Sequence, residues 1–166
     1  AELYDSQPAD EQVVLLLGVA GAEAALWAGD AAEAGLWVQE ALDGLDAIYA
    51  HQLGGIMLAA LGIAAHAQQA AEGSVDAARA LLAVAEETAA KGMPRAGTLG
   101  PEGRSWLVRA RAELTRLTGP DPGAWTEVVD AFAYETGEGC CPNGYRQAYG
   151  RVRRAEERTG GAHDDH

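Results

Sequence analysis

Glycine and proline divide this chain into alanine- and leucine-rich segments that are each long enough for several helical turns. The clearest segment runs from Asp30 to Tyr49, where apolar residues recur at spacings of three and four. Such spacing places them in one stripe along an α-helix. Val and Ile are sparse, Phe132 is the only Phe, and no stretch alternates polar and apolar residues for long. The sequence therefore predicts an all-α fold without a β-sheet.

The helix-breaking residues predict about seven helices. Gly29 ends the first helix, and Asp30 caps the second. Gly73 ends the third, and Ser74 is the expected cap of the fourth. Asp121 is the expected cap of the sixth, with Pro122 in its first turn. The predicted helices span 8–27, 30–49, 51–72, 74–91 and 102–118, a sixth starts at 121, and a seventh carries Tyr145, Ala148, Tyr149, Val152 and Ala155.

These breaks organise the chain into four parts. Residues 1–91 hold the first two helix pairs and form an acidic half. Residues 92–101 are a flexible joint rich in Gly and Pro. Residues 102–159 hold a third helix pair plus a capping helix, and residues 160–166 are a disordered tail.

A repeat links the second, fourth and sixth predicted helices. Each carries two small residues seven positions apart, and successive copies are offset by 44 and then 46 residues. These residues are Ala34 and Ala41, Ala78 and Ala85, and Ala124 and Ala131. Small residues let paired helices approach closely, and a helix pair repeated at a fixed interval is typical of an α-solenoid. The predicted architecture is therefore an α-solenoid of antiparallel helix pairs.

The formal net charge of the whole chain is −13, and acidic residues dominate its first half. Residues 1–78 contain no Lys or Arg against twelve Asp and Glu, and Arg79 is the first basic residue. Such a surface repels phosphate backbones, so this segment is not expected to bind nucleic acid. One interpretation is a solubilising surface. The other is a docking face for a basic partner, including another domain of the same polypeptide.

The sequence predicts a cytoplasmic location without a membrane span. The stretch Ile56 to Ala65 is too short to cross a bilayer. The N-terminus is acidic and lacks the apolar core of a signal peptide. Cys140 and Cys141 are adjacent and have no third cysteine to pair with. The first residue is Ala rather than Met, which is consistent with a fragment of a longer protein.

The residues do not predict an enzyme, a cofactor or a metal site. His51 and His66 are fifteen residues apart, which is about 22 Å along a straight helix, so they cannot share one metal. The tail from His163 to His166 has ligand-type residues but no fold to hold them. The Cys140-Cys141 pair is either a plain loop pair or a reactive thiol beside a helix N-terminus. The chain has no GxSxG segment.

The turn Trp27-Ala-Gly-Asp30 followed by Ala34 and Ala41 resembles the middle of a tetratricopeptide repeat. That family places Gly in the turn and small residues five and twelve positions later. Gly73, Ala78 and Ala85 repeat this spacing. The third copy departs from it, with extra residues around Gly119 to Pro122. The resemblance implies a tetratricopeptide-like fold.

The second half is similar to a segment of large LuxR-family transcriptional regulators of the maltose-regulator type, which are signal-transduction ATPases. The similar residues are Gly103-Arg-Ser-Trp106, Arg109-Ala-Arg-Ala-Glu113, Asp121-Pro-Gly-Ala-Trp125, Tyr145-Arg-Gln-Ala-Tyr149, Arg151 and Ala155-Glu156. The resemblance implies a sensor arm between an ATPase domain and a helix-turn-helix domain. Neither a GxxxxGK[ST] run nor a basic recognition helix is present, and Cys140-Cys141-Pro142 alters the linker before Tyr145.

Aromatic and arginine side chains are the candidate binding residues. Core packing between helices is one interpretation of the tryptophans. The other is a concave groove of the kind through which solenoids bind. The candidate groove residues are Trp37, Tyr49, Trp106, Arg109, Trp125, Tyr145 and Tyr149. The predicted function is an interaction or sensor module that binds a protein partner, other domains of the same polypeptide or a small effector. A free-standing helical adaptor is the alternative.

Overall fold

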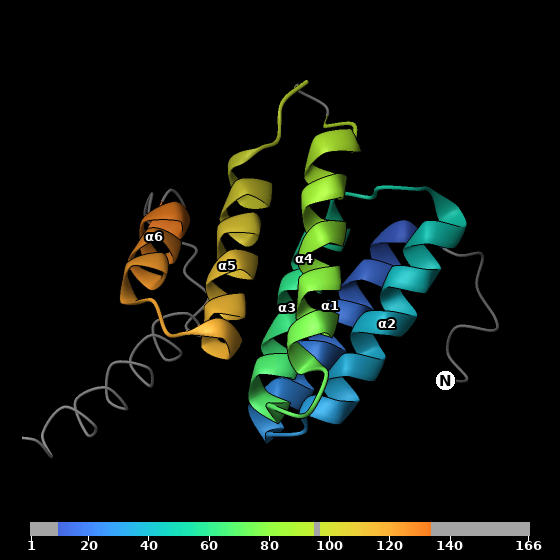
Figure 1. The fold of residues 1–166 in the computed structure, drawn as a ribbon. Helices are drawn as coiled ribbons and strands as arrows, with labels where there is room; N and C mark the ends of the chain where they lie inside the picture. Colours follow the sequence, from blue (N-terminus) through green and yellow to red (C-terminus); the bar gives the residue numbers. More distant parts are fainter. Residues whose placement is uncertain (1–9, 95–96, 134–166) are drawn as a thin grey trace, which may run out of the picture. The chain divides into compact units, whose positions relative to one another are not determined.

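The computed structural model describes residues 10–94 and 97–133, and within them the chain is all-helical, as the sequence predicts (Figure 1). The described ranges contain no β-strand. The helices are α1 Glu11–Ala28, α2 Ala31–Ile48, α3 Gly54–Gln69, α4 Ser74–Lys91, α5 Pro101–Thr118 and α6 Pro122–Phe132. The predicted seventh helix, Cys140, Cys141 and the histidine tail lie outside the described residues.

Two of the predicted helix starts are confirmed by hydrogen bonds. The Asp30 carboxylate accepts a hydrogen bond from the backbone N–H of Glu33 at 3.0 Å, and Gly29 before it ends α1 with a φ of 82°. Asp121 caps α6 by accepting from the backbone N–H of Gly123 at 2.9 Å. In each case a short acidic side chain satisfies a backbone donor that the first helical turn leaves free.

Other helix ends differ from the predictions. Helix α1 begins at Glu11, not near Pro8, because the Asp10 side chain caps it. Helix α3 is shorter than the predicted 51–72, since His51 (φ 58°) and Ala70 (φ 48°) have left-handed backbones that interrupt a right-handed helix. The prediction that Ser74 caps α4 is wrong. Gly73 occupies the N-cap position, and the Ser74 hydroxyl accepts from the upstream backbone N–H of Ala71.

Helix α3 lies at the centre of the packing and contacts α1, α2, α4 and α5. Its side chains are apolar around most of its circumference, which is the pattern of a helix enclosed by others. The fully enclosed residues include Ile56, Leu58, Ala59, Ala60, Leu61 and Ile63, each 0% exposed. The stretch Ile56 to Ala65 is therefore the core of this fold.

The small residues of the repeat behave differently in the third copy. Ala34, Ala41, Ala78 and Ala85 are all 1% exposed or less, so in the first two copies they face the partner helix. Ala124 and Ala131 are only half-buried on α6. Helix α6 has slight contact with the other helices, which is why its small residues are not enclosed. The described residues up to Ala131 belong to one compact unit.

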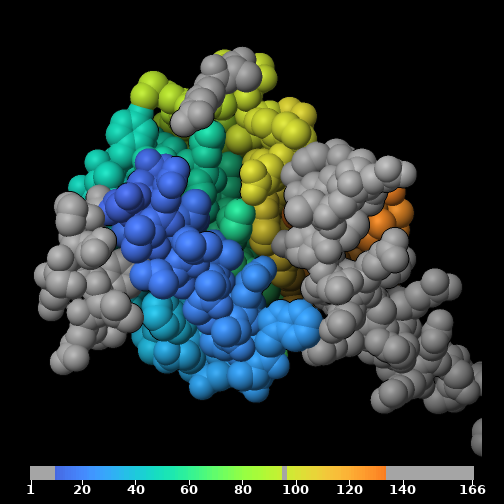
Figure 2. Space-filling view, turned by 180° about the vertical axis from the view of Figure 1, so that it is seen from behind, coloured from blue at the N-terminus to red at the C-terminus, as the bar shows by residue number. Residues whose placement is uncertain are grey.

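Among the described residues one helix, α1, is long and apolar enough to span a membrane by length and composition. The core helix of a soluble protein and a signal sequence meet the same criteria of length and composition. Helix α1 packs on α2 and α3 and carries Glu23. Its outer face also bears exposed apolar side chains, among them Leu16 and Trp27, and Figure 2 shows α1, in blue, at the surface.

Helix α5 packs directly on α3 and α4. The segment predicted as a joint, 92–101, therefore connects helices that lie within one compact unit. Gly97 in this segment has a φ of 74°, a left-handed conformation that glycine adopts without steric cost. The flexibility expected of this segment stays a prediction.

Candidate binding groove

A groove opens between α2 and α4, over α3. Both outer helices pack extensively on α3, whereas contact between α2 and α4 themselves is slight. The cavity that results has a volume of about 380 Å³, at the low end of the range of small-molecule pockets. The apolar part of its lining consists of Val38, Leu42 and Leu45 from α2 and Ala77, Ala80, Leu81 and Val84 from α4.

Two glycines of α3, two helical turns apart, form the floor. At Gly62, side chains from both walls lie close to the floor. A Cβ built there would stand 2.7 Å from Leu81 Cδ1 and 3.0 Å from Val38 Cγ1. At Gly55 the nearest side-chain atoms are 3.7 Å away on Leu42 and 4.0 Å away on Thr88. The groove is therefore more open at the Gly55 end.

Polar side chains surround the groove. On α2, Gln39 Nε2 donates a hydrogen bond to Asp43 Oδ1 at 2.8 Å, and Asp46 lies one turn further along. His51 lines one end of the cavity and His66 the other. His51 precedes α3 and His66 lies in its last turn, so most of the length of α3 separates the two histidines.

The charge of the α2 wall is uncompensated. The helix carries Glu33, Glu40, Asp43 and Asp46 and no basic residue. Among the described residues the ion pairs all lie on α4 and α5. The basic residues of α4, Arg79 and Lys91, each pair with an acidic residue of their own helix. No Lys or Arg lines the cavity.

The aromatic residues predicted to line a groove lie elsewhere. The Trp37 indole lies over Gly21 of α1, where an added Cβ would be 2.4 Å from ring atom Cδ2. Tyr49 is exposed just beyond α2, and Trp125 on α6 is half-buried. None of these is part of the cavity lining. Tyr145 and Tyr149 lie outside the described residues.

The structure brings together two of the predicted groove residues, Trp106 and Arg109. The guanidinium carbon of Arg109 lies 4.8 Å from the centre of the Trp106 ring, a cation–π geometry. Trp106 is 6% exposed. Neither residue lines the cavity between α2 and α4.

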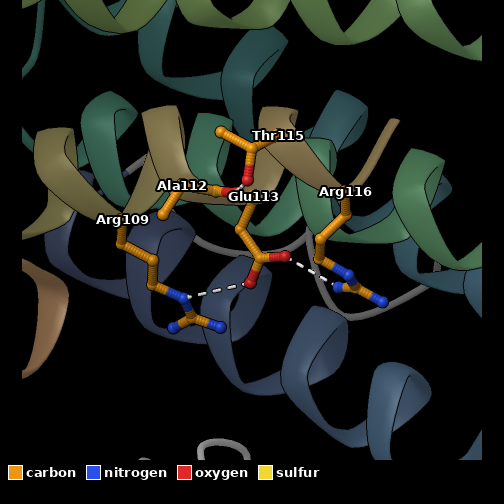
Figure 3. Close-up of polar contacts among 5 residues, drawn as sticks. All are labelled: Arg109, Ala112, Glu113, Thr115 and Arg116. Carbon is orange, nitrogen blue, oxygen red and sulfur yellow. Dashed lines mark hydrogen bonds and ion pairs between the residues drawn. The ribbon is translucent and has the colours of Figure 1, made fainter. Parts of the chain in front are cut away.

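Arg109 also belongs to a polar cluster on α5 (Figure 3). Glu113 is 3% exposed. Its carboxylate forms two ion pairs, one between Oε1 and Arg109 Nε at 3.5 Å and one between Oε2 and Arg116 Nη1 at 2.7 Å. Two cations thus neutralise one buried carboxylate, an arrangement that makes a buried charge tolerable. The Thr115 hydroxyl donates to the Ala112 carbonyl at 2.7 Å. This cluster accounts structurally for Arg109, Glu113 and Arg116.

Within the described ranges there is no group of three His, Cys, Asp or Glu side chains that could hold a metal ion. His51, Asp46 and Thr88 all line the cavity, but no side-chain hydrogen bond among the described residues joins them. The chemistry that the groove offers is binding by apolar contact, hydrogen bonding and negative charge.

No protein-family model, curated protein or solved structure matches this chain. The geometry alone therefore defines the candidate site. Sequence reasoning missed Asp43, Asp46, Leu42 and Val84 as a set. The signal present in the sequence was the combination of a helix with only acidic charges and two glycines seven positions apart in the next helix.

Proposed function

We propose that this chain is an interaction module that binds a protein partner in the groove between α2 and α4. The observation that carries the proposal is the coincidence of an apolar cavity with a wall of unpaired carboxylates. Val84 in this lining is 40% exposed. Apolar surface in a concave site, edged by polar groups, is typical of a binding surface. The module does not turn over a substrate.

The pattern of contacts between helices supports a tetratricopeptide-like arm. Helix α1 packs on α2, and α3 packs on α4, while α3 also contacts α1 and α5. Successive helix pairs of a solenoid stack on one another in this way. Helix α6 departs from the pattern through its slight contact with α5. The same departure is visible in sequence, where the third copy has a different spacing.

The proposal extends to the role of the arm. We place it in a LuxR-family regulator, on the strength of the residues from Gly103 to Trp125 and those beyond the described ranges. A free-standing adaptor is the alternative. Sequencing of the flanking coding region separates the two. A phosphate-binding GxxxxGK[ST] segment upstream and a helix-turn-helix segment downstream would support the regulator, whereas a start and a stop codon at the two ends would support the adaptor.

Binding in the groove is tested with an unbiased peptide display library and two tryptophan substitutions. Ala80 is exposed and lines the groove, and Ala83 is exposed on the same helix outside it. Peptides selected on the wild-type chain should lose at least tenfold in affinity for Ala80→Trp and keep their affinity for Ala83→Trp, because only the first indole fills the cavity. Peptides that tolerate both substitutions would place the binding surface elsewhere and refute the proposal.

A further inference from the structure

We propose that the occupant of the groove is a cationic amphipathic helix of the partner protein. This inference rests on the proposed function and adds the chemistry of the ligand. It follows from three features of the groove: the charge of one wall, the apolar surface between the walls, and the helical nature of both walls.

Charge is the first feature. Asp43 and Asp46 are three positions apart on α2, so their carboxylates lie on the same helix face, at the cavity. Neither forms an ion pair within the described residues. A ligand that covers them with apolar surface would strip water from two unpaired charges, which is unfavourable. A Lys or Arg on the ligand removes this cost and adds attraction at long range.

Apolar surface is the second feature. Leu42 of α2 lies beside Gly55, and Leu81 of α4 lies over Gly62, so each wall contributes a leucine to the cavity. Val84 adds exposed apolar surface on the α4 wall. A ligand must therefore combine apolar side chains, which enter the cavity, with cationic side chains, which reach the α2 rim. Lys and Arg suit the rim because their long stems can lie along apolar surface while the charge stays at the edge.

The third feature is the secondary structure of the walls. Helices α2 and α4 satisfy their backbone groups internally and offer no strand edge to an incoming chain. An extended ligand would leave backbone N–H and C=O groups unpaired against Leu42, Leu81 and Val84. A helix satisfies its own backbone, and apolar residues at spacings of three and four give it one apolar face. Helix-in-groove binding is therefore the mode that the walls permit.

A fluorescein-labelled synthetic peptide of about 15 residues, long enough to become helical on binding, tests this inference by fluorescence anisotropy. It carries Leu at helical spacing on one face and Lys on both flanks. A matched peptide carries Glu in place of each Lys. The Lys peptide should bind, the Glu peptide should bind at least tenfold more weakly, and affinity should fall severalfold between about 50 and 200 mM salt.

Charge reversal on α2 locates the contact. The substitution Asp43→Lys should weaken binding of the Lys peptide by at least tenfold. Glu40→Lys makes a like change of charge on the same helix, at an exposed position outside the cavity lining, and should change affinity by less than about threefold, the residual effect of net charge. Circular dichroism checks that each variant remains helical.

The outcomes separate this inference from the proposed function. Equal weakening by Glu40→Lys would mean general attraction to an acidic surface and would overturn the inference. Equal binding of the Glu and Lys peptides, or no binding of either, would also overturn it. Selected library peptides that lack Lys and Arg but are sensitive to Ala80→Trp would refute the cationic helix while leaving the groove as the binding surface. Library peptides insensitive to Ala80→Trp would refute both.

Discussion

Gly18 of α1 lies directly against Ala41 of α2. A Cβ built on Gly18 would stand 2.3 Å from the Cβ of Ala41 and 3.3 Å from Cδ2 of Leu58. The first of these distances is far below van der Waals contact, and Ala41 has no flexible side chain that could move aside. The two helices therefore approach as closely as they do because position 18 has no side chain.

Gly18→Ala is expected to lower the free energy of unfolding by about 2 kcal/mol, because overpacking outweighs the gain in helix propensity. Gly35→Ala is the matched control, since a Cβ on Gly35 meets nothing within 4 Å. That variant should be more stable by about 0.5–1 kcal/mol. Urea unfolding followed by circular dichroism measures both. A Gly18→Ala variant as stable as the wild type would contradict the close packing of α1 on α2.

Glu113→Gln is expected to destabilise the protein by about 3 kcal/mol, because Arg109 would lose the carboxylate that neutralises it while remaining largely buried. The side chain of Arg109 is only 13% exposed. The comparison is Arg111→Gln, which breaks an exposed ion pair between Arg111 and Glu86. That change should cost less than about 1 kcal/mol. If Glu113→Gln and Arg111→Gln lowered the free energy of unfolding equally, in thermal or urea unfolding, Glu113 would not be a buried cluster residue.

Ser105→Ala is expected to loosen α6. The Ser105 hydroxyl, 1% exposed, lies 3.0 Å from the Pro101 carbonyl and 2.5 Å from the Ala131 carbonyl. Its contact with Ala131 joins α5 to α6, which otherwise have slight contact. The loss should be about 1 kcal/mol, and amide hydrogen exchange should accelerate in α6 more than in α3. Unchanged exchange in α6 would mean that this hydrogen bond does not hold it.

Lys91→Gln is expected to raise the pKa of Glu87 toward its ordinary value. In the wild-type protein the hydrogen bond from Lys91, and then its charge, hold the pKa of the Glu87 carboxyl below that value. A lowered folded-state pKa stabilises the protein above the pKa of the unfolded chain, and this contribution is lost as the pH falls through the folded-state pKa. An NMR titration of the Glu87 side chain measures the shift. An identical titration curve in the variant would exclude the pairing.

The sequence predicted the helices better than their arrangement. Periodicity and the caps at Asp30 and Asp121 located most helix ends, because these signals act between near neighbours. The start of α3 was misplaced because the left-handed backbone at His51 is imposed by the turn before the helix and not by a helix breaker.

The sequence predicted a concave groove but not the residues that line it, because the lining depends on which helix faces pack together. Trp37 and Trp106 have the size and chemistry of ligand-binding residues, but tertiary packing places one on Gly21 and encloses the other. Asp43 and Asp46 look like ordinary exposed carboxylates in sequence. They line a groove only because α4 packs on α3 beside α2.

NMR chemical-shift mapping with the Lys-flanked helical peptide tests the central claim most directly. If the groove is the binding surface, the largest changes in backbone amide shifts should fall between Gly35 and Asp46 on α2 and between Ala77 and Thr88 on α4. The exposed face of α1 around Leu16 should change little. Largest changes on α1 or α5, or no changes in the presence of excess peptide, would contradict the account.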